Sequence, residues 1–112
     1  MENIKAQMKK GVLELCVLSV LQKEEKYPSE ILEILKEKKL IVVEGTIYPL
    51  LSRLKNDKLL EYKWRESNSG PPRKYFTITE KGKKYYEELC IAWEELDKSI
   101  SQLISKKQNK TK

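Results

Sequence analysis

The chain has 112 residues, of which 36% are charged and 39% are apolar, and its net charge is +6. This length allows one domain with a modest core, and the composition is typical of a soluble, helix-rich protein. No apolar run approaches the ~20 residues that a membrane helix needs, and the N-terminus lacks the apolar core of a signal peptide. We therefore expect a cytoplasmic protein with no membrane partner.

The positive charge is concentrated near the C-terminus. Four lysines and no acidic residue fall within residues 101–112, whereas the rest of the chain is only mildly basic. Lysine-rich tails of this kind are often solvated and disordered, and we expect this of residues 107–112. The net charge is compatible with a nucleic-acid partner but is weak evidence for one.

The sequence offers little for catalysis or metal binding. It has no histidine and no Cys-x-x-Cys pair, and Cys16 and Cys90 stand alone within apolar patterns. We interpret them as buried thiols, and a redox-sensing thiol is the alternative. Because there is also no nucleophile motif and no phosphate loop, we expect no enzyme activity, no metal site and no cofactor.

Apolar spacing predicts three helices in the first half of the chain. The first, over residues 3–23, is apolar around most of its circumference in its second half, which indicates burial on more than one side. The second covers residues 27–39 and starts at Pro28, since proline suits the first helical position. The third covers residues 44–57, where Pro49 is tolerable only near the helix start.

A β-hairpin and a long helix are predicted to follow. Residues 60–65 and 75–78 alternate between apolar and polar side chains, which indicates two half-buried strands. Residues 67–72, rich in Ser, Gly and Pro, are expected to form a loop longer than the tightest hairpin turns. Thr79 is placed to cap a final helix that continues to about Lys106.

The order of three helices, a hairpin and a final helix is that of a winged helix-turn-helix, a mainly α fold with a β-hairpin wing. In this arrangement the third helix enters the DNA major groove with its polar side while its apolar side packs on the core. The polar side carries hydroxyl, phenol and cationic groups suited to phosphates or base edges, on Thr46, Tyr48, Ser52, Arg53 and Lys55. An ordinary polar surface helix is the alternative.

The predicted wing strengthens the DNA-binding interpretation. Pro71 and Pro72 stiffen the hairpin loop, because proline fixes the backbone angle φ. The cations Arg73 and Lys74 follow at the base of the loop, where they can reach a phosphate or a minor groove. A solvated hairpin tip is the alternative.

The final helix carries an apolar seam with alternating spacings of three and four residues, formed by Tyr86, Leu89, Trp93, Leu96, Ile100 and Leu103. Because a small core cannot cover a helix of ~40 Å, this coiled-coil repeat predicts a homodimer, which suits a pseudo-palindromic operator in double-stranded DNA. The seam can also pack on the chain's own first helix. We thus expect a DNA-binding domain over residues 1–79 and a dimerisation helix over residues 80–106.

Three motifs resemble the PadR family of bacterial transcriptional regulators, and the similarity extends over nearly the whole chain. They are Gly45-Thr46-Ile47-Tyr48-Pro49-Leu50-Leu51-Ser52-Arg53-Leu54, Gly70-Pro71-Pro72-Arg73-Lys74-Tyr75-Phe76 and Ile78-Thr79-Glu80-Lys81-Gly82. In that family they correspond to the recognition helix, the wing and the start of the last helix. The resemblance implies a dimeric repressor.

The short length and single C-terminal helix are similar to the smaller subgroup of that family, which includes multidrug-binding repressors with a flat apolar pore at the dimer interface. The resemblance implies that Trp93 stacks on a planar aromatic ligand in such a pore, with Asp97 nearby to suit cations. It also implies that Met8 and Leu15 line the pore. From the residues alone, Trp93 fills a dimer core or lines a pocket.

Two departures from the family pattern affect these expectations. Lys58 stands where the family usually has glycine, and a left-handed backbone there would cost about 1 kcal/mol. Residues 27–30 replace a glycine-containing motif, so contacts of the second helix are not carried over. The alternative function is a winged-helix protein-interaction module with a neutral or acidic recognition face, and Arg53 and Lys55 weigh against it.

Overall fold

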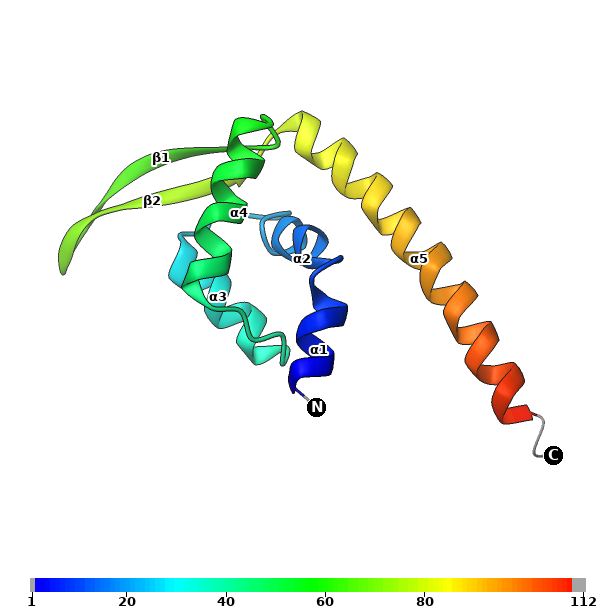
Figure 1. Ribbon diagram of the computed structural model, residues 1–112. Coiled ribbons are helices and arrows are strands. Elements are labelled where there is room, and N and C mark those ends of the chain that lie inside the picture. The colour runs from blue at the N-terminus through cyan, green and yellow to red at the C-terminus, as the bar shows by residue number, and fades with distance from the viewer. Residues whose placement is uncertain (1, 110–112) are drawn as a thin grey trace.

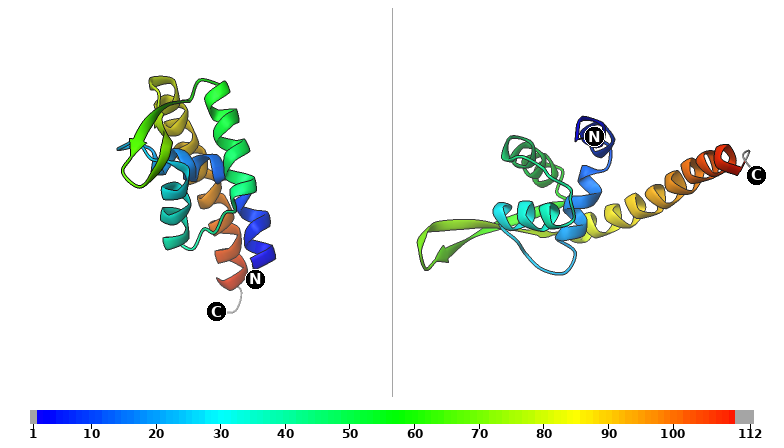
Figure 2. Two further views of the ribbon diagram at one scale, coloured as in Figure 1. Left: turned by 90° about the vertical axis from the view of Figure 1, so that its left-hand side faces the viewer. Right: turned by 90° about the horizontal axis from the view of Figure 1, so that it is seen from below.

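The computed structural model describes residues 2–109 and the side chains of residues 3–105. The elements in this part of the chain are α1 (Glu2–Lys9), α2 (Leu13–Val20), α3 (Pro28–Glu37), α4 (Glu44–Asn56), β1 (Leu60–Ser67), β2 (Gly70–Ile78) and α5 (Glu80–Asn109). The hairpin and α5 extend in opposite directions from a cluster of short helices (Figures 1 and 2). This mainly α architecture with a two-stranded wing and a long terminal helix confirms the predicted fold class.

The predicted first helix over residues 3–23 is wrong, because it is two helices in the structure. α1 ends at Lys9 and α2 begins at Leu13, and the turn between them is closed by the Val12 amide, which donates to the Lys9 carbonyl (3.0 Å). Gly11 lies in this turn, where its low helix propensity favours the break. The expected central burial is nevertheless found for α2, in which Val17 and Leu18 are fully buried.

The core lies where α2, α3, α4 and the base of the hairpin meet. Leu18 of α2, Ile31 of α3 and Ile47 of α4 are fully buried, and Phe76 and Ile78 of β2 close the core from the side of the hairpin. Full burial of each such side chain contributes about 1.5–3 kcal/mol. These contacts hold α4 against α2 and α3, and they leave its opposite side exposed.

Two lysines end α3 and α4 in the left-handed conformation. Lys39 and Lys58 both have a φ of 65°. After Lys58, the Leu59 amide donates to the Leu54 carbonyl (2.9 Å), which is the Schellman pattern of helix termination. Glycine is usual at this position because a side chain is strained there, so the predicted cost of Lys58 applies.

Replacing Lys58 with glycine is expected to raise the free energy of unfolding by about 1 kcal/mol, because the left-handed strain is relieved. Chemical denaturation at fixed protein concentration measures the difference. Lys38→Gly is the matched control, since Lys38 has an ordinary φ of −90°. A Lys58→Gly variant no more stable than its parent would show that the terminus relaxes without cost.

The hairpin has longer strands and a tighter turn than predicted. β1 and β2 pair in an antiparallel register that reaches Ser67 and Gly70, so that only two residues link the strands and the expected loop over residues 67–72 is wrong. Pro71 and Pro72 lie within β2. They are opposite the point on β1, between Arg65 and Ser67, at which the strand register shifts. Proline has no amide hydrogen to donate, and irregular strand pairing accommodates it.

α5 begins as predicted, with Thr79 as its cap. The Gly82 amide donates to Thr79 Oγ1 (3.0 Å), and the Thr79 hydroxyl donates to the Lys58 carbonyl (2.7 Å). α5 reaches Asn109, beyond the predicted end at Lys106, and residues 110–112 of the predicted basic tail lie outside the described residues. In the described part of the chain, no helix combines the length and the apolarity required to span a membrane.

Candidate nucleic-acid interface

The exposed side of α4 is positioned by the residues that it buries. Ile47, Leu51 and Leu54 recur at helical spacing and are fully buried against the core. The opposite direction therefore belongs to Gly45, Pro49, Ser52 and Asn56, which are all exposed. Of these only Ser52 was among the predicted DNA contacts, although a helical projection of the buried stripe identifies the other three.

The remaining predicted residues of α4 divide between its two flanks. Tyr48 faces the wing. Lys55 is on the same flank of α4, with its Nζ 5.7 Å from the centre of the Tyr62 ring. Thr46 and Arg53 face the other way, toward the start of α2. A duplex that contacts all of them must lie across the exposed side of α4.

Arg53 is tied to two other helices through Glu14. Its Nη1 lies 3.5 Å from Glu14 Oε1 and 3.9 Å from Asp57 Oδ2, and the Tyr85 hydroxyl of α5 donates to the same Glu14 oxygen (3.2 Å). Burial, together with the Glu14 charge, raises the pKa of Tyr85, so its hydroxyl remains a donor. Arg53 keeps about half of its side chain exposed, so Glu14 orients the guanidinium without covering it.

The two cations of the wing were expected at the base of a free loop. In the structure, each lies over an aromatic ring instead. Arg73 Cζ is 4.3 Å from the centre of the Tyr27 ring, and Lys74 Nζ is 4.3 Å from the centre of the Tyr62 ring. Successive residues of a strand point to opposite faces, so the two cations project from opposite faces of β2. Neither forms an ion pair with a carboxylate within residues 3–105.

The wing is anchored to the segment before α3. Lys26 and Phe76 form a β-bridge, and Arg65 Nη2 donates to Glu25 Oε1 (3.0 Å). Tyr27 and Tyr75 pack edge to face with their ring centres 5.2 Å apart. These contacts set the position of the hairpin relative to α4.

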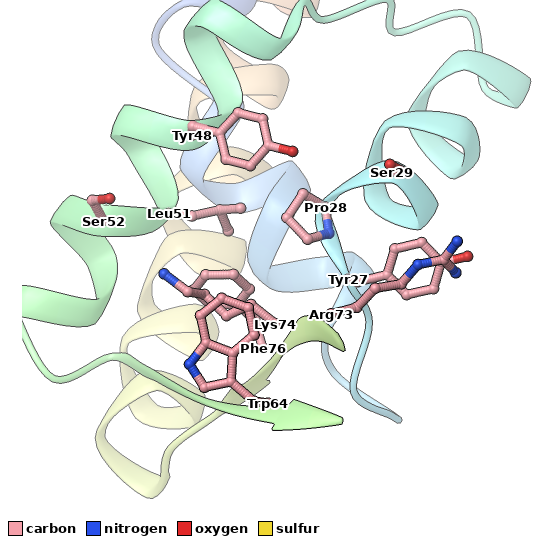
Figure 3. A pocket seen from close by; sticks show the side chains of 10 residues that line it. All are labelled: Tyr27, Pro28, Ser29, Tyr48, Leu51, Ser52, Trp64, Arg73, Lys74 and Phe76. Atoms are coloured by element: carbon pink, nitrogen blue, oxygen red, sulfur yellow. The ribbon is translucent and has the colours of Figure 1, made fainter. Parts of the chain in front are cut away.

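Beyond its base, β1 is not half-buried as predicted. Leu60 is buried, but Tyr62 is 36% exposed and Trp64 is 62% exposed. Trp64 borders a hollow of about 360 Å³ between α4 and the wing. Figure 3 shows the side chains that line it, which are Tyr27, Pro28, Ser29, Tyr48, Leu51, Ser52, Trp64, Arg73, Lys74 and Phe76. Trp64 was not among the predicted site residues, although the alternation of β1 already placed it on the same face as Tyr62.

The chain is similar in sequence and structure to known regulators. Residues 17–88 match the transcriptional regulator PadR-like family. A PadR-like transcription factor from Bacteroides fragilis is 53% identical, with a TM-score of 0.75 over 90% of this chain and 98% of that one. The chain belongs to the PadR-like family of transcriptional regulators.

Two further structures agree. A PadR-like transcriptional regulator from Bacillus cereus is 40% identical, with a TM-score of 0.77 over 88% of this chain and 96% of that one. A PadR family regulator from Eggerthella lenta is 27% identical, with a TM-score of 0.83 over 92% of this chain and 90% of that one. These matches confirm the resemblance, and they make this PadR-like protein a DNA-binding regulator of transcription rather than an enzyme.

The predicted seam of this PadR-like chain has two parts. Tyr86 and Leu89 pack against the chain's own core, and the Tyr86 hydroxyl donates to Ser19 Oγ (3.3 Å). The alternative of packing on the chain's own N-terminal helices is thus realised in the first part. The second part is exposed over 44–69% of each side chain, at Trp93, Leu96, Ile100 and Leu103.

The four residues implied to bind a ligand lie on three helices. Met8 of α1 is 74% exposed, Leu15 of α2 is half-buried, and Trp93 and Asp97 are exposed on α5. The Ser101 hydroxyl donates to Asp97 Oδ1 (3.2 Å). α1 and the second half of α5 diverge (Figure 1), so a pore lined by both helices would need a second chain to close it.

Both cysteines are free and half-buried rather than buried. Cys16 packs against the core, and its burial raises the pKa of the thiol. A redox-sensing thiol needs a lowered pKa, so this environment does not favour that alternative for Cys16.

Proposed function

We propose that this PadR-like protein is a homodimeric repressor that acts in the cytoplasm on a pseudo-palindromic operator. The observation that carries the proposal is the exposed apolar face of α5, where Trp93, Leu96, Ile100 and Leu103 recur at coiled-coil spacing. Pairing of two such faces would bury them and would present two copies of α4 to successive major grooves. Residues 1–79 then form the DNA-binding domain, and residues 80–106 form the dimerisation helix.

In this proposal, α4 enters the major groove and the wing contacts the adjacent backbone or minor groove. The proposed DNA contacts are Thr46, Tyr48, Ser52, Arg53, Lys55, Arg73 and Lys74. The exposed hydroxyls of α4 support this assignment, because hydroxyls bind phosphates and base edges. The two wing cations, which pair with no carboxylate of the described residues, support it for the same reason. Arg53, oriented by Glu14 and exposed at its outer edge, is suited to a base contact.

A mobility-shift assay with the promoter of the chain's own gene, or of a neighbouring transporter gene, tests the proposed contacts. We expect Arg53→Ala and Arg73→Ala each to weaken binding by about tenfold, and Arg73→Ala to reduce the salt slope by about 1. Lys98→Ala is the control, since Lys98 is an exposed cation on the second half of α5. Arginine variants that bind like the parent would contradict the assignment, and reporter activity that falls without the protein would contradict repression.

The proposed effector is a planar aromatic molecule bound at the dimer interface by Met8, Leu15, Trp93 and Asp97. A Trp64→Phe variant leaves Trp93 as the only tryptophan, because the chain has two. We expect proflavine, a planar aromatic cation, to quench its emission with saturation, and Asp97→Asn to weaken the effect. A variant in which Trp93 is not quenched, or in which Asp97→Asn changes nothing, would contradict this ligand site.

A further inference from the structure

The hollow between α4 and the wing is bordered by two aromatic side chains that the described residues leave exposed. Trp64 is 62% exposed and Tyr48 is 47% exposed, whereas Pro28 and Leu51, which also border the hollow, are buried. Figure 3 shows Tyr48 projecting from α4 on one side and Trp64 from β1 on the other. An indole left this open on a small domain indicates a surface that meets a partner.

The charge of the hollow indicates an anionic partner. Although they project from opposite faces of β2, Arg73 and Lys74 both border it, and no carboxylate of the described residues does. Lys74 Nζ lies 4.3 Å from the centre of the Tyr62 ring and 5.5 Å from that of Trp64. Aromatic faces orient a cation without neutralising it, so the positive charge of both side chains remains available.

The position of the hollow indicates which anion this is. When a helix occupies the major groove and a neighbouring hairpin reaches the adjacent minor groove, one sugar–phosphate strand passes between the two elements. In this protein the space between α4 and the wing is the hollow itself. This step rests on the proposed use of α4 and the wing.

We propose that the hollow seats the sugar–phosphate backbone of one DNA strand, with Trp64 as its principal contact. Deoxyribose carbons would pack on the indole of Trp64 and on the ring of Tyr48, which are both exposed. Phosphate oxygens would accept hydrogen bonds from hydroxyls at the rim, such as those of Ser29 and Tyr48, beside Arg73 and Lys74. The hollow thus combines apolar rings for the sugars with hydroxyls and cations for the phosphates.

The full-length Trp93→Phe variant tests this proposal, because Trp64 is then the only tryptophan. We expect a 30-bp promoter duplex to shift the emission of Trp64 with saturation. In anisotropy titrations, Trp64→Ala is expected to weaken duplex binding about tenfold with an unchanged salt slope, since no charge is lost. Trp64→Phe should restore most of the affinity, and Ile91→Ala is the control, because Ile91 is an equally exposed apolar residue on α5.

Titration with small anions distinguishes a binding site for the DNA backbone from a site that binds any small anion. We expect inorganic phosphate and benzoate, at millimolar concentration and constant ionic strength, to leave the emission of Trp64 unchanged. A saturable response to either anion that competes with the duplex would overturn the proposal. The proposal would also be overturned if the parent binds the duplex and Trp64→Ala binds it with the same affinity. Failure of the unsubstituted protein to bind any duplex would instead refute the proposed function.

Discussion

Gly82→Ala is expected to lower the free energy of unfolding by about 3 kcal/mol, because the start of α5 packs directly on the chain after α4. A Cβ atom at position 82 would lie 2.1 Å from the Leu59 carbonyl oxygen and 2.7 Å from Ile78 Cγ1. The first of these atoms belongs to the backbone, so relief requires α5 to move away from the hairpin base. The same junction holds the Thr79 cap, whose hydroxyl donates to the Lys58 carbonyl.

Thermal unfolding at a fixed protomer concentration measures this effect, and we expect the Tm to fall by roughly 10–20 °C. Gly45→Ala is the matched control, because a Cβ atom there meets nothing within 4 Å. Since Gly45 lies in a helix, alanine should stabilise the protein by about 0.5–1 kcal/mol. A Gly82→Ala variant as stable as its parent would show that the junction of β1, β2 and α5 shifts without cost.

Ile100→Glu is expected to convert the proposed dimer to a monomer and to weaken operator binding. Ile100 lies on the exposed apolar face of α5, and pairing would place a glutamate from each chain in a desolvated seam. An uncompensated buried charge costs about 3–5 kcal/mol, so we expect the dimer dissociation constant to rise at least about a hundredfold. Operator affinity should fall with it, because the two half-site contacts are no longer linked.

Sedimentation velocity over a range of protein concentrations measures the change in mass. Gln102→Glu is the matched control, since Gln102 is exposed on the side of α5 that faces away from the seam. Circular dichroism verifies that both variants keep their helix content. An unsubstituted protein that sediments as a monomer, or an Ile100→Glu variant that remains dimeric, would contradict the proposed seam.

The elements that the sequence predicted well depend on short-range rules. Pro28 lies at the first position of α3 and Thr79 caps α5, because capping and the fixed φ of proline act within a single turn. The buried stripe of α4, which includes Ile47 and Leu51, also follows from helical spacing alone. Recognition of the family motifs added the expectation of strain at Lys58, and the observed φ of 65° confirms the left-handed backbone.

The errors occur where local patterns were ambiguous. Apolar residues continue on both sides of Gly11, so periodicity did not reveal the break between α1 and α2. Pro71 and Pro72 resemble a loop, but pairing between Ser67 and Gly70 continues the ladder beyond them. The break follows the low helix propensity of Gly11, whereas in the hairpin a cross-strand contact outweighed the local preference of the prolines.

By itself, the sequence determined that this protein is a winged helix-turn-helix with a third helix over residues 44–57, a hairpin wing and a long final helix that carries an apolar seam. Only the tertiary structure decided that Arg53 is held by Glu14, 39 residues earlier, and that Lys74 lies over the rings of Tyr62 and Trp64. It also decided that Trp64 and Tyr48 border one hollow. Periodicity and capping act over a few residues, whereas these arrangements depend on how α2, α4 and the hairpin pack together.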